Sequence, residues 1–333
     1  LKSHGHETCL VHVGTGFVPD RVNSVLAEVR KHMPVGLIAF SCTSFEFGRV
    51  KQIAEAIKRK YPNIPLVLGG THATIRPEDL EHTAFDGFCV GEGEEALLEL
   101  VECLEQEKSF LNVRNFHFKN HVNGDYDEDF VVKNPVSPFV KDLNSLPPPD
   151  WEIMNTRKLL EIRQGWLGVI FSRGCPCACS FCVNDVLRKI KGKEGYTRRR
   201  SVDSVIQELK FLVDKYPVKV VNIEDDLLVQ DRVWIKEFSE RFRKEIFDKT
   251  GIHFKIESRV DVFDEDLARA LAEGSCQEVQ FGVETANADL LKLLDKRITR
   301  EQVIRAFGLC DKYHMKTMAF LMLGVPGETE GTI

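Results

Sequence analysis

The sequence lacks the features that mark several common classes of protein. It has no apolar run long enough to span a bilayer and no signal-peptide pattern at its start. Its net charge of −6 over 333 residues is mild and implies no general nucleic-acid-binding surface. Its ten cysteines do not have the pattern of a disulfide scaffold, because four are bunched and six lie scattered among apolar residues. We therefore expect a cytoplasmic protein with reduced thiols.

Neither end of the sequence has the form expected of a complete chain. It starts at Leu1 rather than at Met, and it stops at Ile333, within a predicted strand-to-helix junction. We therefore expect it to be an internal piece of a longer protein. The length is enough for two domains, and an apolar content of 43% supports sizeable cores.

The most informative stretch is a cysteine-rich loop, LGVIFSRGCPCACSFC, which runs from Leu167 to Cys182. Its first five residues predict a buried strand, and the Ser-Arg-Gly that follows ends the apolar run. The loop then carries thiols at Cys175, Cys179 and Cys182. Thiolates are soft ligands, so thiols clustered in this way favour an iron–sulfur cluster or zinc.

The spacing of these thiols favours the cluster over zinc. Three thiolates on one short loop can hold three corners of a [4Fe–4S] cluster and leave one iron open to another ligand. A structural zinc site needs a fourth ligand, usually from a second knuckle, and the sequence has no second CxxC. Cys177 could supply a fourth sulfur, but four ligands within eight residues are cramped.

Residues 8–105 alternate between strand and helix signals, which predicts a doubly wound parallel sheet. In such sheets, ligands bind outside the carboxyl ends of the strands. The loops Ser41–Ser44, Gly69–Ala73 and Gly91–Glu94 fall there, and their glycines allow close approach to a ligand, although tight turns also use glycine. The predicted strands are Thr8–Val13, Val35–Ser41, Pro65–Leu68 and Gly87–Val90, and the predicted helices contain Val22–Val29, Val50–Ile57 and Glu94–Leu104.

The remaining sequence predicts a hairpin, a connector and a barrel. Residues 113–118 and 129–132 flank the turn signal Asn123-Gly124, and residues 134–155 are rich in proline. From residue 167 onward, five strand–helix units predict a barrel or partial barrel. Thr299 and Gln302 predict a capping box at the start of one helix. The predicted strands after the cysteine loop are Val218–Ile223, Ile252–Ile256, Glu278–Val283 and Lys316–Leu323.

Polar residues end each of the later barrel strands, which is where the site residues of parallel barrels lie. Each group also has a structural alternative. A carboxylate at a strand end can cap the next helix, and Arg259 can pair with Asp261 or Glu257. The groups at these ends are Glu224-Asp225-Asp226, Glu257-Ser258-Arg259, Glu284-Thr285 and Gly324–Thr329.

The cysteine loop resembles that of the radical S-adenosylmethionine (SAM) superfamily, in which CxxxCxxC with an aromatic residue before the last Cys follows the first strand of an α/β barrel. The resemblance implies that Cys175, Cys179 and Cys182 bind a [4Fe–4S] cluster, that Phe181 belongs to the cofactor site and that Cys177 is a bystander. It also implies that SAM binds the open iron and is cleaved reductively to methionine and a 5′-deoxyadenosyl radical.

The same resemblance implies which residues contact SAM. Glu224 and Asp225 stand at the position of the family's acidic motif after the second strand. Glu284, in FGVET, is similar to a ribose contact, and Arg259 is placed to meet the SAM carboxylate. Gly324, in GVPGET, is similar to a loop that lines the adenine through its backbone.

The N-terminal region resembles the cobalamin-binding domain that precedes the radical SAM core in one subfamily. The shared features are the serine-rich loop after VGLIAFS, the GGTHAT loop and the helix start GEGEEAL. The DxHxxG motif that supplies a lower axial His in other cobalamin proteins is absent, the first strand of the domain is expected to be missing, and His72 is interpreted as a loop-capping residue. The resemblance places the nucleotide tail of cobalamin against Ser41, Thr43, Ser44, Gly69, Gly70 and Thr71.

We therefore expect an α/β protein that is truncated at both ends. A flavodoxin-like, doubly wound cobalamin-binding domain is predicted at 1–110, a hairpin and Pro-rich connector at 111–160, and a partial (β/α)6 radical SAM barrel at 161–333. The resemblance extends to class B radical SAM methyltransferases and to the anaerobic Mg-protoporphyrin monomethyl ester oxidative cyclase.

The expected function is cobalamin-dependent methylation of an unactivated carbon by a radical SAM enzyme. One alternative is a radical SAM enzyme without cobalamin that performs oxidative cyclisation or rearrangement, and another is a non-catalytic iron–sulfur or zinc-binding protein. The expected partners are a small-molecule or peptide substrate and an electron donor such as flavodoxin or ferredoxin. We expect no nucleic-acid partner and no membrane span.

Overall fold

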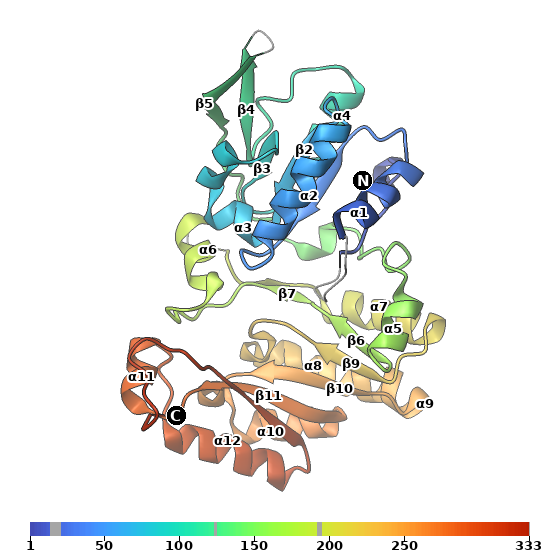
Figure 1. The fold of residues 1–333 in the computed structure, drawn as a ribbon. Coiled ribbons are helices and arrows are strands. Elements are labelled where there is room, and N and C mark those ends of the chain that lie inside the picture. The colour runs from blue at the N-terminus through green and yellow to red at the C-terminus, as the bar shows by residue number, and fades with distance from the viewer. Residues whose placement is uncertain (14–20, 123–124, 192–194, 333) are drawn as a thin grey trace. The chain divides into compact units, whose positions relative to one another are not determined.

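The computed structural model describes residues 1–13, 21–122, 125–191 and 195–332, and for residues 120–122, 125–130 and 191 it describes the backbone alone. These residues form two compact units. The first comprises the described residues of 1–140 together with 189–191, and the second comprises 141–188 and 195–332. Each unit is built around one five-stranded sheet (Figure 1).

The sheet of the first unit has the strand order β1-β2-β3-β4-β5. Its first three strands are parallel, and β4 and β5 form an antiparallel hairpin beside β3 (Figure 1). The hairpin confirms the two strands predicted there, and its turn at Asn123-Gly124 lies outside the described residues. The elements are α1 Arg21–Lys31, β1 Ile38–Ser41, α2 Phe47–Lys60, β2 Leu66–Gly69, α3 Gly70–Ile75, β3 Gly87–Cys89, α4 Glu94–Glu105, β4 Phe116–Val122 and β5 Asp125–Lys133, with short 3₁₀ turns at Lys2–His4 and Pro77–His82.

Side-chain alternation along the strands gives this sheet two packed faces. Leu66 and Leu68 pack with Ile53 and Ile57 of α2, in a core that also holds the apolar residues of α1. Val67, which lies between the two leucines, packs on the opposite face with α4. The helices therefore cover both faces of the sheet, as the alternating strand and helix pattern predicts.

Two sequence-based expectations for this unit are wrong. Thr8–Val13 is not a strand, because it pairs with none of the described strands, and its valines Val11 and Val13 instead pack against the core of α1 and α2. The predicted loop Gly69–Ala73 is mostly helical, because α3 begins at Gly70 directly after β2. The backbone N–H of His72 donates to the carbonyl of Cys42 at 3.2 Å, which docks the start of α3 on the loop after β1.

The sheet of the second unit has five parallel strands in the order β12-β11-β10-β9-β6, which is the sequential order that a barrel requires (Figure 1). A short pair, β7-β8, adds a second ladder. Thr299 and Gln302 form the predicted capping box at the start of α12. The elements are α5 Thr156–Ile162, β6 Trp166–Val169, β7 Ser172–Arg173, α6 Val183–Lys191, β8 Arg198–Arg199, α7 Val202–Lys215, β9 Val220–Ile223, α8 Arg232–Phe242, a π-helical turn Arg243–Phe247, α9 Asp248–Thr250, β10 His253–Ser258, α10 Glu265–Glu273, β11 Cys276–Glu284, α11 Ala288–Leu293, α12 Arg300–Lys312 and β12 Lys316–Leu321, with 3₁₀ turns at Leu143–Ser145, Leu228–Gln230 and Val260–Val262.

The two faces of this sheet differ in chemistry. On one face, residues such as Ile223, Ile256 and Val279 form a large core with α7, α8, α10 and α12. On the other face, Lys255 forms an ion pair with Glu278 at 3.0 Å, and its Nζ lies 3.5 Å from the centroid of the Trp166 ring. The strands are therefore held by hydrocarbon on the helix side and carry polar groups on the other side.

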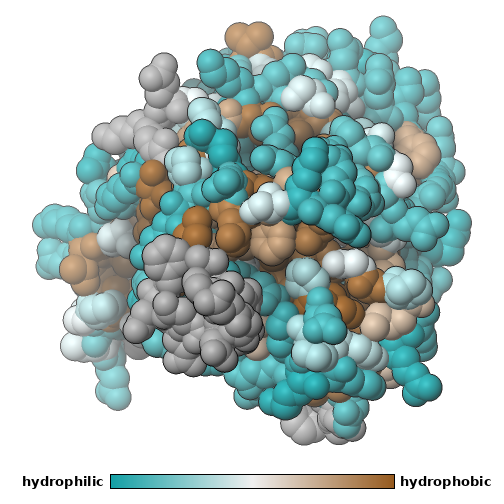
Figure 2. Space-filling view, turned by 90° about the horizontal axis from the view of Figure 1, so that it is seen from above, coloured by the Kyte–Doolittle hydropathy of each residue, from teal (hydrophilic) through white to brown (hydrophobic). Residues whose placement is uncertain are grey.

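The described helices include none that is both long enough and apolar enough to cross a membrane. Seen from above, hydrophilic residues cover most of the visible surface, and patches of hydrophobic residues lie among them (Figure 2).

Candidate cofactor sites

Two of the three loops predicted to bind a ligand in the first unit lie together at the carboxyl ends of β1 and β2. Gly70 has a φ of +86°, and a Cβ there would lie 2.7 Å from Ser41 Oγ and 2.9 Å from the carbonyl of Cys42. The Thr43 backbone N–H and hydroxyl both donate to Glu46 Oε2, at 3.1 and 3.0 Å. The structure therefore brings the serine-rich loop and the GGTHAT segment into contact, and glycine is needed where they meet.

His72 lies beneath these loops and does not act as a cap at their surface. Its ring is 4% exposed and stacks on Phe47 with centroids 3.7 Å apart. Its Nδ1 lies 3.0 Å from Ser44 Oγ, and its Nε2 lies 3.3 Å from Asp79 Oδ2. Burial lowers the pKa of His72, and the negative charge of Asp79 opposes this change. The interpretation of His72 as a simple loop cap is therefore incomplete, because its buried ring supports Ser44.

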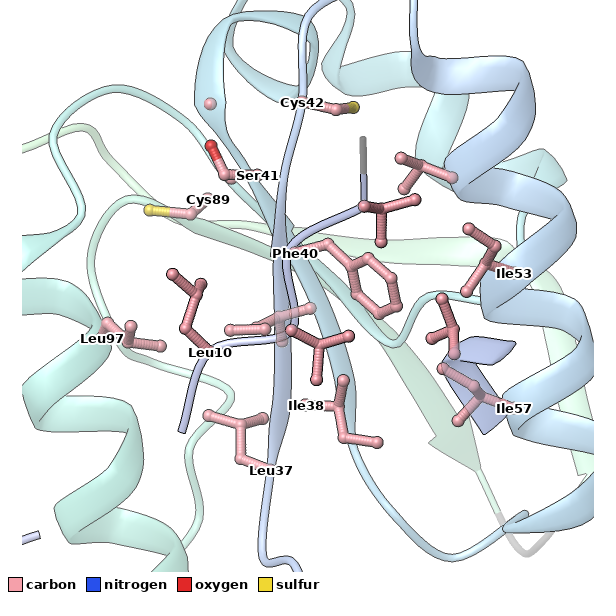
Figure 3. A pocket seen from close by; sticks show the side chains of 18 of the residues that line it. Leu10, Leu37, Ile38, Phe40, Ser41, Cys42, Ile53, Ile57, Cys89 and Leu97 are labelled. Atoms are coloured by element: carbon pink, nitrogen blue, oxygen red, sulfur yellow. The ribbon is translucent and has the colours of Figure 1, made fainter. Parts of the chain in front are cut away.

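A cavity of about 740 Å³ opens beside β1 in the first unit. The strand residues Ile38 and Phe40 point toward Ile53 and Ile57 of α2, whereas Leu97 and Cys89 lie on the other side of the strand (Figure 3). Its polar end is formed by Ser41, Gly69, Gly70, Gly91 and Gly93. The cavity thus joins an apolar interior to the three predicted ligand loops, which is the usual composition of a ligand site.

The cysteine loop of the second unit follows β6 and β7. Cys175 and Cys179 are buried, Cys177 and Cys182 are partly exposed, and all ten cysteines of the chain are free thiols. A hydrogen bond between the thiols of Cys175 and Cys177, together with burial, raises the pKa of Cys175, and the same bond lowers that of Cys177. The structure thus brings the predicted bystander next to a predicted ligand.

Two N–H donors point at the sulfurs of predicted cluster ligands. Arg259 NH1 lies 3.4 Å from Cys179 Sγ, and Asn184 Nδ2 lies 3.7 Å from Cys182 Sγ. Burial raises the pKa of Cys179, and the positive charges of Lys296 and Arg259 act against this rise. N–H donors and nearby cations stabilise thiolates, which are the form of cysteine that binds metals.

Asp225 anchors the strand end from which the cysteine loop begins. Its carboxylate is 1% exposed and accepts from the backbone N–H of Phe171 at 3.0 Å, from that of Ser172 at 2.5 Å, and from the Ser172 hydroxyl. Burial raises the pKa of Asp225 to about 6, although these hydrogen bonds oppose the rise. Both oxygens are therefore occupied by the backbone of the loop, whereas Glu224 is exposed at the same strand end.

A small network next to the loop was not predicted from the sequence. Asn184 donates to Asp226 Oδ1 at 2.8 Å and accepts from the Tyr196 hydroxyl at 2.5 Å. Asn184 stands two residues after Cys182, and Tyr196 is buried. The position of Asn184, two residues after the last cysteine of the loop, could have indicated its contact with that thiol from the sequence. Its contact with Tyr196 could not, because only the fold brings the two residues together.

Arg259, which was predicted to meet the SAM carboxylate, is buried among protein groups. Its Nε and NH2 each donate to Asp261 at 2.9 Å, and NH2 also donates to the carbonyl of Lys296 at 2.7 Å. The structural alternative, a pair with Asp261, is thus present together with the contact to Cys179. The guanidinium fastens the cysteine loop to the end of β10.

The remaining predicted SAM residues lie at the ends of β11 and β12. Glu284 is buried and forms an ion pair with Lys296 at 2.8 Å, and Lys296 Nζ lies 5.9 Å from the centroid of the Phe181 ring. Met322 N donates to the carbonyl of Glu284 at 2.8 Å, which links the loop containing Gly324 to this strand end. The backbone N–H of Gly324 donates to Glu328 Oε2 at 2.6 Å.

Glu257 adds a titratable group at the end of β10. Burial raises the pKa of Glu257 to about 7, and the negative charges of Glu224, Asp226 and Asp225 contribute to the rise. A carboxyl group with this pKa is half ionised at neutral pH, so its charge responds to a cation bound nearby.

The donor set of the cysteine loop fits an iron–sulfur cluster. Within the described ranges, no three Cys, His, Asp or Glu side chains already converge as the ligands of a single metal ion. The loop nevertheless carries soft thiols on one short segment, and Arg259 and Asn184 direct N–H groups at two of them. Metal sites are commonly completed only when the metal binds.

Two family models match the chain. The model of the Radical SAM superfamily matches residues 169–333, and that of the B12 binding domain matches residues 1–101. These ranges lie within the predicted domains, and the exact boundaries stay predictions.

Curated relatives match nearly the whole chain. An uncharacterized methyltransferase of Pyrococcus horikoshii is 28% identical over 332 residues, which cover 99% of this chain and 69% of the relative. The anaerobic magnesium-protoporphyrin IX monomethyl ester cyclase of Rubrivivax gelatinosus is 30% identical over 323 residues, which cover 94% of this chain and 55% of the relative. The chain thus spans about half to two thirds of the length of these relatives.

Solved structures share the fold. The radical S-adenosylmethionine methyltransferase TsrM from Kitasatospora setae superposes with a TM-score of 0.72 at 20% identity, over 94% of this chain and 61% of that chain. The cobalamin-dependent S-adenosylmethionine radical enzyme OxsB superposes with a TM-score of 0.72 at 18% identity, over 90% of this chain and 42% of that chain. The fold of this chain is therefore the one that it shares with TsrM and OxsB.

Proposed function

Because the chain belongs to the radical SAM superfamily and carries a B12-binding domain, we propose that it is an enzyme that cleaves SAM reductively and methylates an unactivated carbon with the help of cobalamin. When bound, the cluster supplies an electron to SAM, and cobalamin supplies a carrier for the methyl group. The substrate is a small molecule or a peptide, and the electron comes from a reduced carrier such as flavodoxin or ferredoxin.

The observation that carries this proposal is the way the second unit holds the cysteine loop. Asp225 fixes the backbone before Cys175, Arg259 contacts Cys179, and Glu284 lies at the neighbouring strand end. Cys175, Cys179 and Cys182 would hold the cluster. Glu224 and Glu284 would meet the amino and ribose groups of SAM, and the backbone at Gly324 would line its adenine.

The first unit supports a corrinoid site. Its cavity of about 740 Å³ ends at Ser41, Gly69 and Gly70, where the two predicted cobalamin loops meet. The nucleotide tail of cobalamin would enter the apolar part, and the hydroxyls of Ser41, Thr43, Ser44 and Thr71 would bind its polar groups.

The test is anaerobic reconstitution of the chain with iron, sulfide and hydroxocobalamin, followed by a strong reductant and SAM. We expect bound iron, bound corrinoid and release of 5′-deoxyadenosine or S-adenosylhomocysteine. A preparation that binds metal and never consumes SAM would contradict the proposal and favour a non-catalytic metal-binding protein.

A second candidate function is oxidative cyclisation on the same core, because the cyclase of Rubrivivax gelatinosus is 30% identical to this chain. The two candidates differ in their product. A methylated product from labelled SAM supports methyl transfer, whereas 5′-deoxyadenosine without transfer of the label supports oxidation.

We expect Gly70→Ala to remove the corrinoid. The new Cβ would meet Ser41 Oγ and the Cys42 carbonyl at under 3 Å, in a left-handed backbone conformation that alanine disfavours. The matched control is Gly48→Ala, where nothing lies within 4 Å. The measurement is corrinoid absorbance retained after desalting, together with thermal unfolding. Equal retention by the two variants would contradict the assignment of this site.

We expect SAM affinity to rise about tenfold between pH 6 and 8, because the cationic ligand favours the ionised form of Glu257, whose pKa is raised to about 7. Below a pH of about 7, Glu257 must release its proton when SAM binds, and above that pH Glu257 is already ionised. Glu257→Gln should flatten the profile, whereas Asp289→Asn, at a side chain that is 90% exposed, should not. A slope that survives Glu257→Gln would assign the dependence to another group.

A further inference from the structure

A buried lysine lies beside the cysteine loop, and no contact with a ligand has been assigned to it. Lys296 is 6% exposed, and its ammonium lies 2.8 Å from Glu284 Oε1. A Cβ at Gly282 would lie 2.7 Å from Glu284 Oε1 and 2.8 Å from Lys296 Nζ. The ion pair therefore lies against Gly282, on the polar face of the second sheet.

The backbone around this pair adopts conformations that side chains disfavour. Glu284, Asp295 and Arg297 have φ values of +66°, +47° and +56°. A left-handed backbone conformation costs energy for any residue other than glycine. It persists only where the surrounding structure holds it in place, and such residues are often found at functional sites. Here the strained residues flank Lys296 on both sides and include its partner.

The lysine segment is tied directly to the cysteine loop. Ser180 donates from its backbone N–H to Leu294 O at 3.0 Å and from its hydroxyl to Leu293 O at 3.1 Å. The carbonyl of Lys296 accepts from Arg259, which also contacts Cys179. The position of Lys296 is therefore set by the same contacts that hold the loop.

The pair leaves one oxygen of Glu284 available. Lys296 occupies Oε1, and the described residues offer no hydrogen-bond donor to Oε2. A buried carboxylate needs a cation to remain charged, and it also accepts strong hydrogen bonds through any free lone pair.

We propose that Lys296 is a positioning residue that fixes Glu284 so that Oε2 accepts from the vicinal hydroxyls of a bound nucleoside. The ligand class is an adenosyl compound with an intact ribose diol. This inference rests on the proposed function, since Glu284 reaches a ribose only if SAM binds here.

The experiment measures anaerobic binding of two ligands, S-adenosylhomocysteine and its 2′,3′-dideoxy analogue, to the iron-loaded chain by calorimetry. Lys296→Met should weaken binding of S-adenosylhomocysteine about ten- to hundredfold, because a charge-assisted hydrogen bond to the diol is lost. It should leave binding of the dideoxy analogue nearly unchanged. Glu284→Ala should show the same selectivity, and its effect should not add to that of Lys296→Met.

Controls separate positioning from stability. Lys292→Met removes a lysine that is 79% exposed and should bind both ligands as the wild type does. Lys296→Met with Glu284→Gln replaces the whole pair, so it should recover the thermal stability that Lys296→Met loses, without regaining diol selectivity. Equal losses for both ligands in Lys296→Met would overturn this inference alone. A wild-type chain that binds neither ligand would overturn the proposed function as well.

Discussion

Replacing Cys179 with alanine is expected to abolish both iron binding and SAM cleavage. Cys179 is buried, receives an N–H contact from Arg259 at 3.4 Å and lies near Lys296, so its thiolate is the best supported of the three predicted ligands. Removal of a supporting residue around a metal commonly costs ten- to a hundredfold, and we expect loss of a ligand to exceed about a hundredfold in release of 5′-deoxyadenosine.

The informative comparison is Cys177→Ala. The structure places Cys177 in a hydrogen bond with Cys175, so its assignment as a bystander needs a direct test. We expect this variant to keep its iron and its nucleoside release, and Cys276→Ala, in the helix-side core, serves as the control for loss of a buried thiol. If Cys177→Ala lost iron as Cys179→Ala does, the ligand set would have to include Cys177.

Replacing Asp225 with alanine is expected to lower the free energy of unfolding by about 3 to 5 kcal/mol, because two backbone N–H groups and one hydroxyl lose a buried acceptor. Urea unfolding of the full chain measures this. Glu224→Gln, at an exposed carboxylate of the same strand end, should leave stability unchanged and weaken SAM binding. A stable Asp225→Ala variant with weakened SAM binding would show instead that Asp225 is a ligand contact.

The pH dependence of this effect has a definite sign. The pKa of Asp225 is raised to about 6 in the folded chain from an ordinary value of 3.8. The folded state therefore holds the proton more tightly, and the contribution of Asp225 to stability is greatest below pH 4 and is lost as the pH rises through about 6. The unfolding free energy of the wild type minus that of Asp225→Asn should accordingly be larger at pH 5 than at pH 8.

Local sequence patterns predicted most of the fold and the position of the cysteine loop, whereas the role of its thiols as cluster ligands stays a prediction. Apolar periodicity identified the strands and helices around both cores, and cysteine spacing identified the loop after β6. Thr8–Val13 was assigned wrongly because alternating valines suit a packed segment as well as a strand, and only pairing partners distinguish the two. α3 was missed because the two glycines favoured a turn, whereas a hydrogen bond from His72 to Cys42, thirty residues earlier, sets the helix start.

The residues that support the site could not be inferred in this way. Lys296 stands in a polar stretch that looks solvated, and it is buried because Asp295 and Arg297 turn the backbone on either side of it. His72 and Ser44 meet only when α3 docks on the loop after β1. Contacts between residues distant in sequence, and left-handed conformations of ordinary residues, leave no local pattern.

The chemical difference between the two faces of the second sheet affects how such a scaffold can diversify. The helix side supplies the hydrocarbon packing, while the opposite side carries groups such as Lys255, Glu278 and Gln280. These three side chains are themselves buried and paired, so a change at one of them leaves its partner buried without its hydrogen bond. The polar face therefore constrains variation as strongly as the apolar core does, and its buried pairs can be exchanged at low cost only when both members change together.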